Sequence, residues 1–226
     1  MNAFIASLKE KPDLLAAVAR FNAPEIGDFA PEALPSLPAA LQRDGTLQSL
    51  GGSRAGKAVV RAWIFRQLDV NGVFTDFSEE RRRLALLEKE TLACLGLVYG
   101  ACLYAQEAAL LIKRDEVAVL RGLLGGHYEY VLSRGRFQMR QAAGYFASFM
   151  SGVPLPERMA ETGFAAMRLC LADWPAELFR MAAPRLPSAL RIPADTSAAS
   201  LLPVFWADLK KLLITQVAPR WQPCFA

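Results

Sequence analysis

One segment of the chain has the spacing of a phosphate-binding loop. Residues 51–57 run Gly-Gly-Ser-Arg-Ala-Gly-Lys, which matches the G-x-x-x-x-G-K part of that motif. A working loop also needs a preceding β-strand and, directly after the lysine, a Ser or Thr that holds Mg²⁺. Here Ala58 follows Lys57, and residues 48–50 make a poor strand. We therefore interpret the segment as a flexible lead-in to a helix over 55–69 and expect no nucleotide site.

The single histidine and the four cysteines offer few ways to build a catalytic or metal site. His127 has no serine-elbow, reactive-cysteine or H-E-x-x-H signature around it, so we expect a helix-start residue without a catalytic role. Zinc needs three or four closely spaced ligands, and no two cysteines have C-x-x-C spacing. The cysteines are Cys94, Cys102, Cys170 and Cys224. We expect no catalytic residue, no metal site, no cofactor and no enzymatic activity.

A cluster of arginines around an aromatic residue is the best candidate for partner binding. The sequence from Arg134 runs Arg-Gly-Arg-Phe-Gln-Met-Arg. Arginine and aromatic residues are enriched at protein interfaces. The same pattern also fits a solvated helix face or stacking on RNA bases, and these alternatives stay open. The candidate partner-binding residues are Arg134, Arg136, Phe137 and Arg140.

The periodicity of apolar residues predicts helices almost throughout. Apolar positions recur every three or four residues, and no stretch alternates with period two. The stretch 22–53 is rich in Pro and Gly and is expected to be mostly loop, and Val153-Pro-Leu-Pro156 suggests a joint near 152–156. The expected helices cover 2–21 (one helix kinked near Pro12, or two short ones), 55–69, 78 to about 112 (in one piece or with a break), 115–124, 137–150, 157–173 and 200–217.

The central helix is expected to be buried on two faces. One apolar stripe runs from Leu84 to Ile112, and a second covers another face. Its longest apolar run, 92–105, is shorter than the roughly 20 residues of a membrane span. Gly96 and Gly100 favour close helix packing. The sequence predicts an all-α fold: a compact single-domain helical bundle over 1–226 with a central buried hydrophobic helix and short helices around it.

Composition and charge exclude several classes of protein. Of the 226 residues, 53% are hydrophobic and 21% are charged, which excludes a disordered chain, a collagen and a disulfide mini-protein. The net charge of +4 is mild and spread out, so nucleic acid is not the expected partner. The start of the chain lacks a secretory signal, and the free thiols fit a reduced compartment. The tail, residues 220–225, either plugs the core or docks on a partner; we favour the plug.

The stretch 84–137 has a distinctive order of elements: an apolar central helix, a short helix, a Val-x-x-Leu-Arg helix that ends in Gly, and a Tyr-containing turn. The residues that carry this pattern are Leu92–Gly100, Ala108–Ile112, Glu116–Gly125 and Tyr128–Arg134, then Leu209–Leu213 and Gln216–Pro219. In this pattern the chain resembles the K-type accessory subunit of bacterial type III secretion systems, the SctK (YscK/PscK) family. The resemblance covers about a quarter to a third of the chain, and 1–80 and 138–195 show nothing similar.

The resemblance implies a cytoplasmic, all-helical, non-catalytic adaptor at the cytoplasmic face of the inner membrane. In that family the subunit belongs to the sorting platform under the injectisome. It links the cytoplasmic domain of the inner-membrane ring protein to the pod protein. The alternative functions are a helical type III effector or export chaperone and, less favoured, a helical nucleic-acid binder.

Overall fold

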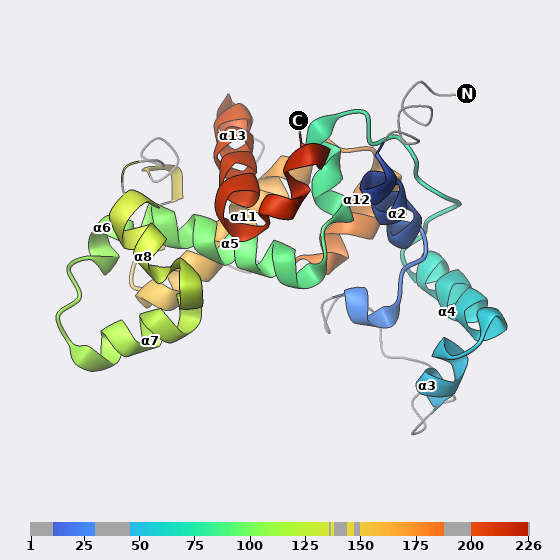
Figure 1. Ribbon diagram of the computed structural model, residues 1–226, viewed down its shortest axis with the longest axis horizontal. Helices are drawn as coiled ribbons and strands as arrows, with labels where there is room; N and C mark the ends of the chain where they lie inside the picture. The colour runs from blue at the N-terminus through green and yellow to red at the C-terminus, as the bar shows by residue number, and fades with distance from the viewer. Residues whose placement is uncertain are drawn as a thin grey trace. The chain divides into compact units, whose positions relative to one another are not determined.

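The computed structural model describes residues 11–29, 46–135, 137, 144–146, 150–187 and 200–225, and every regular element in these ranges is a helix (Figure 1). The predicted all-α class is confirmed. The chain divides into two compact units. Unit 1 comprises Met1–Lys89 and Asp173–Pro187, and unit 2 comprises Glu90–Ala172 and Ser188–Ala226. The turn at 150–154 lies inside unit 2.

Unit 1 is built from short α-helices and 3₁₀ turns. Its first described helix begins with Pro12, which suits a first-turn position, and has Asp13 near its start and Arg20 near its end, as the helix dipole favours. The elements are α2 (Pro12–Phe21), η2 (Ile26–Asp28), α3 (Thr46–Gly51), α4 (Arg54–Gln67), η3 (Glu80–Leu86), α12 (Ala176–Ala182) and η6 (Ala183–Arg185).

A buried arginine joins three parts of unit 1. Arg185 donates hydrogen bonds to the carbonyl oxygens of Phe21 (3.3 Å) and Ala85 (3.4 Å). Its guanidinium also stacks on the rings of Phe21, at 4.6 Å, and Phe29, at 5.5 Å. Burial lowers the pKa of Arg185 to about 10, so it remains charged at neutral pH. The second stretch of unit 1 is thereby tied to the ends of α2 and η3.

Polar side chains make further long-range links in unit 1. Asn22 donates to the Phe74 carbonyl and accepts from the Phe74 amide, both at 2.8 Å. Arg81 pairs with Glu79 at 2.6 Å and with Asp173 at 2.8 Å. The Asp173 pair connects the two stretches of the chain that form this unit.

Of the two alternatives for 78 to about 112, one long helix or a helix with a break, the structure shows a break. Residues 80–86 form the 3₁₀ helix η3, and α5 begins only at Lys89. The extended backbone at Leu87 (ψ 149°) separates them. Apolar residues keep a spacing of three or four across the break, because a 3₁₀ helix also repeats every three residues. The periodicity of the sequence therefore does not reveal where the α-helix begins. Glu79 is the N-cap residue of η3.

Unit 2 packs its helices around α5. The predicted burial of α5 on two faces is confirmed, because Leu95 and Val98 are buried, and so are Leu92 and Tyr99. The elements are α5 (Lys89–Leu103), α6 (Ala105–Ala108), α7 (Arg114–Leu124), η4 (Gly125–His127), α8 (Tyr128–Tyr130), η5 (Val131–Gly135), α11 (Leu155–Leu171), α13 (Leu202–Leu212), η8 (Leu213–Val217) and η9 (Pro219–Cys224).

Three glycines allow α5 and α11 to approach backbone to backbone. A Cβ atom added to Gly163 would overlap the carbonyl oxygen of Gly96, and one added to Gly100 would overlap the carbonyl oxygen of Met159. Side chains larger than hydrogen therefore do not fit at the crossing. This confirms the close helix packing that the Gly96-x-x-x-Gly100 spacing indicated.

The C-terminal tail folds onto its own unit. Trp221, Cys224 and Phe225 are buried, and the ring of Phe225 lies 6.0 Å from that of Trp206 in α13. Of the two alternatives for the tail, the structure shows the plug. The turn η9 that carries it begins at Pro219, directly after the end of the preceding helix.

Candidate docking surface

An exposed apolar surface is formed by α7 and the turn that precedes it. Helix α7 has Asp115 and Glu116 in its first turn, and it ends where Gly125 takes φ +50°, a conformation that suits glycine. Leu120 and Leu124 face the unit and are buried. The side chains one position before each of them therefore point outward.

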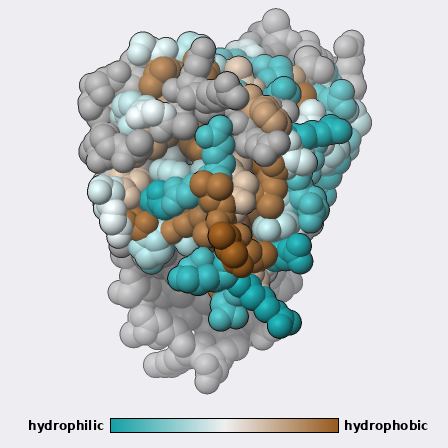
Figure 2. All heavy atoms as spheres, turned by 90° about the vertical axis from the view of Figure 1, so that its left-hand side faces the viewer, coloured by the Kyte–Doolittle hydropathy of each residue, from teal (hydrophilic) through white to brown (hydrophobic). Residues whose placement is uncertain are grey.

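Four large apolar side chains of this segment meet solvent. Val119 is 58% exposed and Leu123 39%, and they are one helical turn apart. In the turn before α7, Leu110 is 77% exposed and Ile112 94% exposed. We call Leu110, Ile112, Val119 and Leu123 the α7 face. Figure 2 shows hydrophobic atoms gathered on this side of the molecule, with hydrophilic side chains beside them.

The charges along this segment are of both signs. Lys113 pairs with Glu116 at 3.2 Å, and both side chains are largely in water. Arg121 lies with its guanidinium 5.0 Å from the ring centre of Tyr128. An apolar surface beside charged side chains is typical of protein contacts, where anchors sit at the centre and polar groups at the rim.

The expected burial of Ile112 is wrong, because this side chain is 94% exposed. The apolar stripe led to a buried central helix that continued to Ile112. In the structure α5 ends at Leu103 and α6 at Ala108, so the stripe loses its helical register before Leu110. The sequence holds one signal for this: Lys113, Arg114, Asp115 and Glu116 follow the apolar run directly.

The predicted arginine cluster is described only in part. Arg134 is exposed in η5, and Phe137 is 58% exposed. Arg136 and Arg140 lie outside the described residues. The role of Arg134, Arg136, Phe137 and Arg140 in partner binding therefore stays a prediction.

The glycine-rich segment at 51–57 does not form a phosphate-binding loop. Ser53 caps α4, and its hydroxyl accepts a hydrogen bond from the Gly56 amide at 2.9 Å. The Lys57 amide bonds to the Ser53 carbonyl, so these donors serve the helix and not a ligand. The expected helix over 55–69 is confirmed as α4, whereas the flexible lead-in is corrected to the helix α3 and a capped turn.

Cys94 and His127 form a side-chain pair in unit 2. The Cys94 Sγ and His127 Nε2 atoms lie 3.4 Å apart. Burial raises the pKa of the Cys94 thiol. A nucleophilic cysteine needs the opposite shift, because the thiolate is the reactive form. The pair therefore has the geometry of a hydrogen bond that fixes η4 against α5.

Acidic and sulfur groups also meet in the interior of unit 2. Burial raises the pKa of Asp208 in α13 to about 6, while Lys211 lowers it in part. Burial and the nearby Asp208 raise the pKa of Cys102 to about 12. Within the described ranges, no three His, Cys, Asp or Glu side chains gather in a way that could hold a metal ion. The helices of these ranges are also too short or too polar to cross a bilayer.

Comparison of the chain with protein-family models, with curated proteins and with solved structures finds no match.

Proposed function

We propose that this chain is a non-enzymatic cytoplasmic adaptor of a type III secretion sorting platform. It would link the cytoplasmic domain of the inner-membrane ring protein to the pod protein. The proposal draws on the resemblance of 84–137 to the K-type subunit family. Most of that stretch forms α5 to η5 of unit 2, together with the α7 face.

The exposure of the α7 face is the observation that carries the proposal. Val119 and Leu123 belong to the Glu116–Gly125 stretch in which the resemblance lies, and their neighbours Leu120 and Leu124 already fill the interior. Fully burying an aliphatic side chain contributes roughly 1.5–3 kcal/mol, so a few such anchors suffice for a specific contact. An adaptor needs these surfaces on a rigid body, and the glycine crossing of α5 and α11 supplies one.

Co-purification with both proposed partners tests the adaptor role. The full chain, with an affinity tag, is expressed with the ring protein's cytoplasmic domain and the pod protein encoded in the same genome. We expect both partners to be retained. The double variant Val119→Asp, Leu123→Asp should lose at least one of them, because two carboxylates would be buried in the contact.

Val73→Asp is the matched control for this experiment. Val73 has the same residue type and the same 58% exposure as Val119, but it lies in unit 1. The control should retain both partners. Retention of both partners by the double variant would contradict the α7 face, and failure of the wild-type chain to retain either would contradict the adaptor role.

The location of a fluorescent fusion separates the adaptor from the alternative functions. An adaptor should form stable foci at the cell envelope that depend on the ring protein. Release of the chain into the medium through the secretion system would instead indicate an effector. Salt-dependent binding to nucleic acid, without envelope foci, would indicate the third function.

A further inference from the structure

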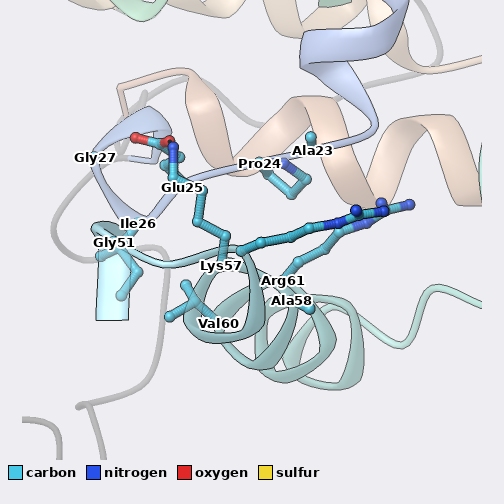
Figure 3. A pocket seen from close by; sticks show the side chains of 11 residues that line it. Ala23, Pro24, Glu25, Ile26, Gly27, Gly51, Lys57, Ala58, Val60 and Arg61 are labelled. Atoms are coloured by element: carbon cyan, nitrogen blue, oxygen red, sulfur yellow. Dashed lines mark hydrogen bonds and ion pairs between the residues drawn. The ribbon is translucent and has the colours of Figure 1, made fainter. Parts of the chain in front are cut away.

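A pocket in unit 1 lies between α4 and the segment around η2. Its volume is about 460 Å³. Figure 3 shows Lys57, Val60 and Arg61 of α4 on one side and the chain from Ala23 to Gly27 on the other. None of these residues belongs to the stretch that resembles the K-type subunits. The pocket is therefore independent of the residues on which the proposed function draws.

The wall that α4 contributes is positively charged. The helix has four basic residues and no acidic one: Arg54, Lys57, Arg61 and Arg66. The first three line the pocket, and Arg66 does not. Their spacing of three and four residues places them on one face, over a length of roughly 10 Å along the axis. Arg54 is exposed, and we find no partner for it among the described residues.

The rest of the lining is largely apolar. Pro24 and Ile26 lie on the η2 side and Val60 on the α4 side. A ligand that fits must therefore present carboxylates to α4 and an aliphatic side chain to these residues. Nucleic acid needs a longer basic stripe and offers no aliphatic group. A free phosphate can pair with the same basic side chains, but it leaves the apolar lining unfilled, and the Gly56 amide is held by Ser53.

The carboxylate of Glu25 already occupies a position that a ligand carboxylate would take. Glu25 pairs with Lys57 at 3.3 Å, and the two side chains are 71% and 60% exposed. Exposed pairs of this kind contribute little to stability. A carboxylate of an incoming partner can therefore replace Glu25 at Lys57 at small cost, while Glu25 itself repels an acidic partner.

We propose that this pocket binds an acidic helical segment of a partner protein. The segment carries at least two carboxylates one or two helical turns apart, which pair with Arg54, Lys57 and Arg61. It also carries an aliphatic side chain that fills the space against Pro24 and Ile26.

Selection from a displayed library of random 12-residue peptides tests the proposal on the full-length chain. The double variant Arg54→Glu, Lys57→Gln serves for counter-selection. Glutamate near the start of α4 favours the helix dipole, so this variant should fold. Peptides kept by the wild-type chain should be enriched in Asp or Glu together with Leu, Ile or Val. No such enrichment overturns the proposal.

Fluorescence anisotropy then measures the best labelled peptide. We expect the double variant to bind at least tenfold more weakly, and binding to weaken several-fold between roughly 0.05 and 0.3 M salt. Glu25→Gln should bind more tightly, because it removes the competing carboxylate. A loss of folding would weaken binding in every variant, so it would not produce weaker binding in one and tighter binding in the other. Circular dichroism checks the folding of each variant separately.

Arg66→Glu is the matched control, because it reverses the same charge on the same helix outside the pocket. It should change binding less than twofold. An equal loss of peptide affinity in Arg66→Glu would mean that the peptide responds to the net charge of the chain and not to the pocket, which would overturn the proposal. Displacement of the peptide by an RNA oligonucleotide, or by vesicles of anionic lipid, at comparable strength would assign the surface to those ligands instead.

Discussion

Distant parts of the chain are joined in unit 1 by a buried polar link and in unit 2 by a backbone contact, beside polar pairs such as that of Arg158 with Glu107. Unit 1 uses long polar side chains: Arg185 reaches the Phe21 and Ala85 carbonyls, and Asn22 pairs with the backbone of Phe74. Unit 2 uses the absence of a side chain, since Gly163 lies against the backbone of Gly96. The contact in unit 1 is lost when a hydrogen-bond donor is removed, and the contact in unit 2 is lost when a larger side chain is introduced.

The two links predict sensitivity to different changes. Arg185 joins the ends of α2 and η3 through donated hydrogen bonds, so removal of its guanidinium should weaken unit 1. Close helix packing requires two regular surfaces, and α5 and α11 are the longest helices among the described residues. Substitutions that add or remove single groups should separate the two cases.

Gly163→Ala should have the largest effect. Its methyl group would overlap the Gly96 carbonyl oxygen, so the two helix backbones must move apart. We expect a loss of about 3 kcal/mol or more in the free energy of unfolding. Urea denaturation measures it, and hydrogen exchange should show faster opening in unit 2 than in unit 1. Unchanged stability would refute the backbone contact at this crossing.

Arg185→Ala should rank next and should act on unit 1. It removes two charge-assisted hydrogen bonds and the stacking on Phe21. We expect the free energy of unfolding to fall by about 2–4 kcal/mol. Arg185→Met also removes the hydrogen bonds but keeps most of the side-chain volume, so its loss of stability should be smaller. Equal losses in the two variants would mean that the hydrogen bonds and the stacking account for the whole effect and that the buried volume does not matter.

Asp208→Asn should stabilise unit 2 in a pH-dependent way. Burial raises the pKa of Asp208 from its ordinary value of 3.8 to about 6. The folded chain therefore binds this proton more tightly than the unfolded chain does. The protonated carboxyl contributes its full stability to the folded state below about pH 4, and this contribution is lost as the pH rises through 6. The free energy of unfolding of the variant should exceed that of the wild type by on the order of 1 kcal/mol at pH 8 and should equal it at pH 4. The gain is small because water screens this half-buried group. Melting curves at both pH values check this; a gain that does not change with pH would contradict it.

Gly122→Ala should have the smallest effect, and of opposite sign to Gly163→Ala. Gly122 lies inside α7, and a Cβ atom there would have nothing within 4 Å. Alanine favours the helix over glycine by about 0.5–1 kcal/mol, so we expect that gain in the free energy of unfolding. The same substitution thus destabilises one helix of unit 2 and stabilises another. A loss of stability here would show that α7 packs more tightly on its outer side than the structure indicates.

The sequence predicted those elements whose signals lie within a few neighbouring residues. The end of α7 follows from Gly125, and the paired glycines of α5 indicated a close helix contact. The candidate site was harder to predict. Ile112 continues an apolar stripe, and nothing in its spacing shows that the helix ends before it.

By itself, then, the sequence determined that the chain is helical, which helices have apolar faces and where several of them stop. These properties depend on backbone preferences and side-chain period over one or two turns. Only the tertiary structure decided that Gly163 meets Gly96, that Arg185 reaches the end of α2 and that Arg54, Lys57 and Arg61 share a pocket with Pro24 and Ile26. These contacts join residues that are 28 or more positions apart, and such pairs are selected by the packing of the whole unit and not by any local pattern.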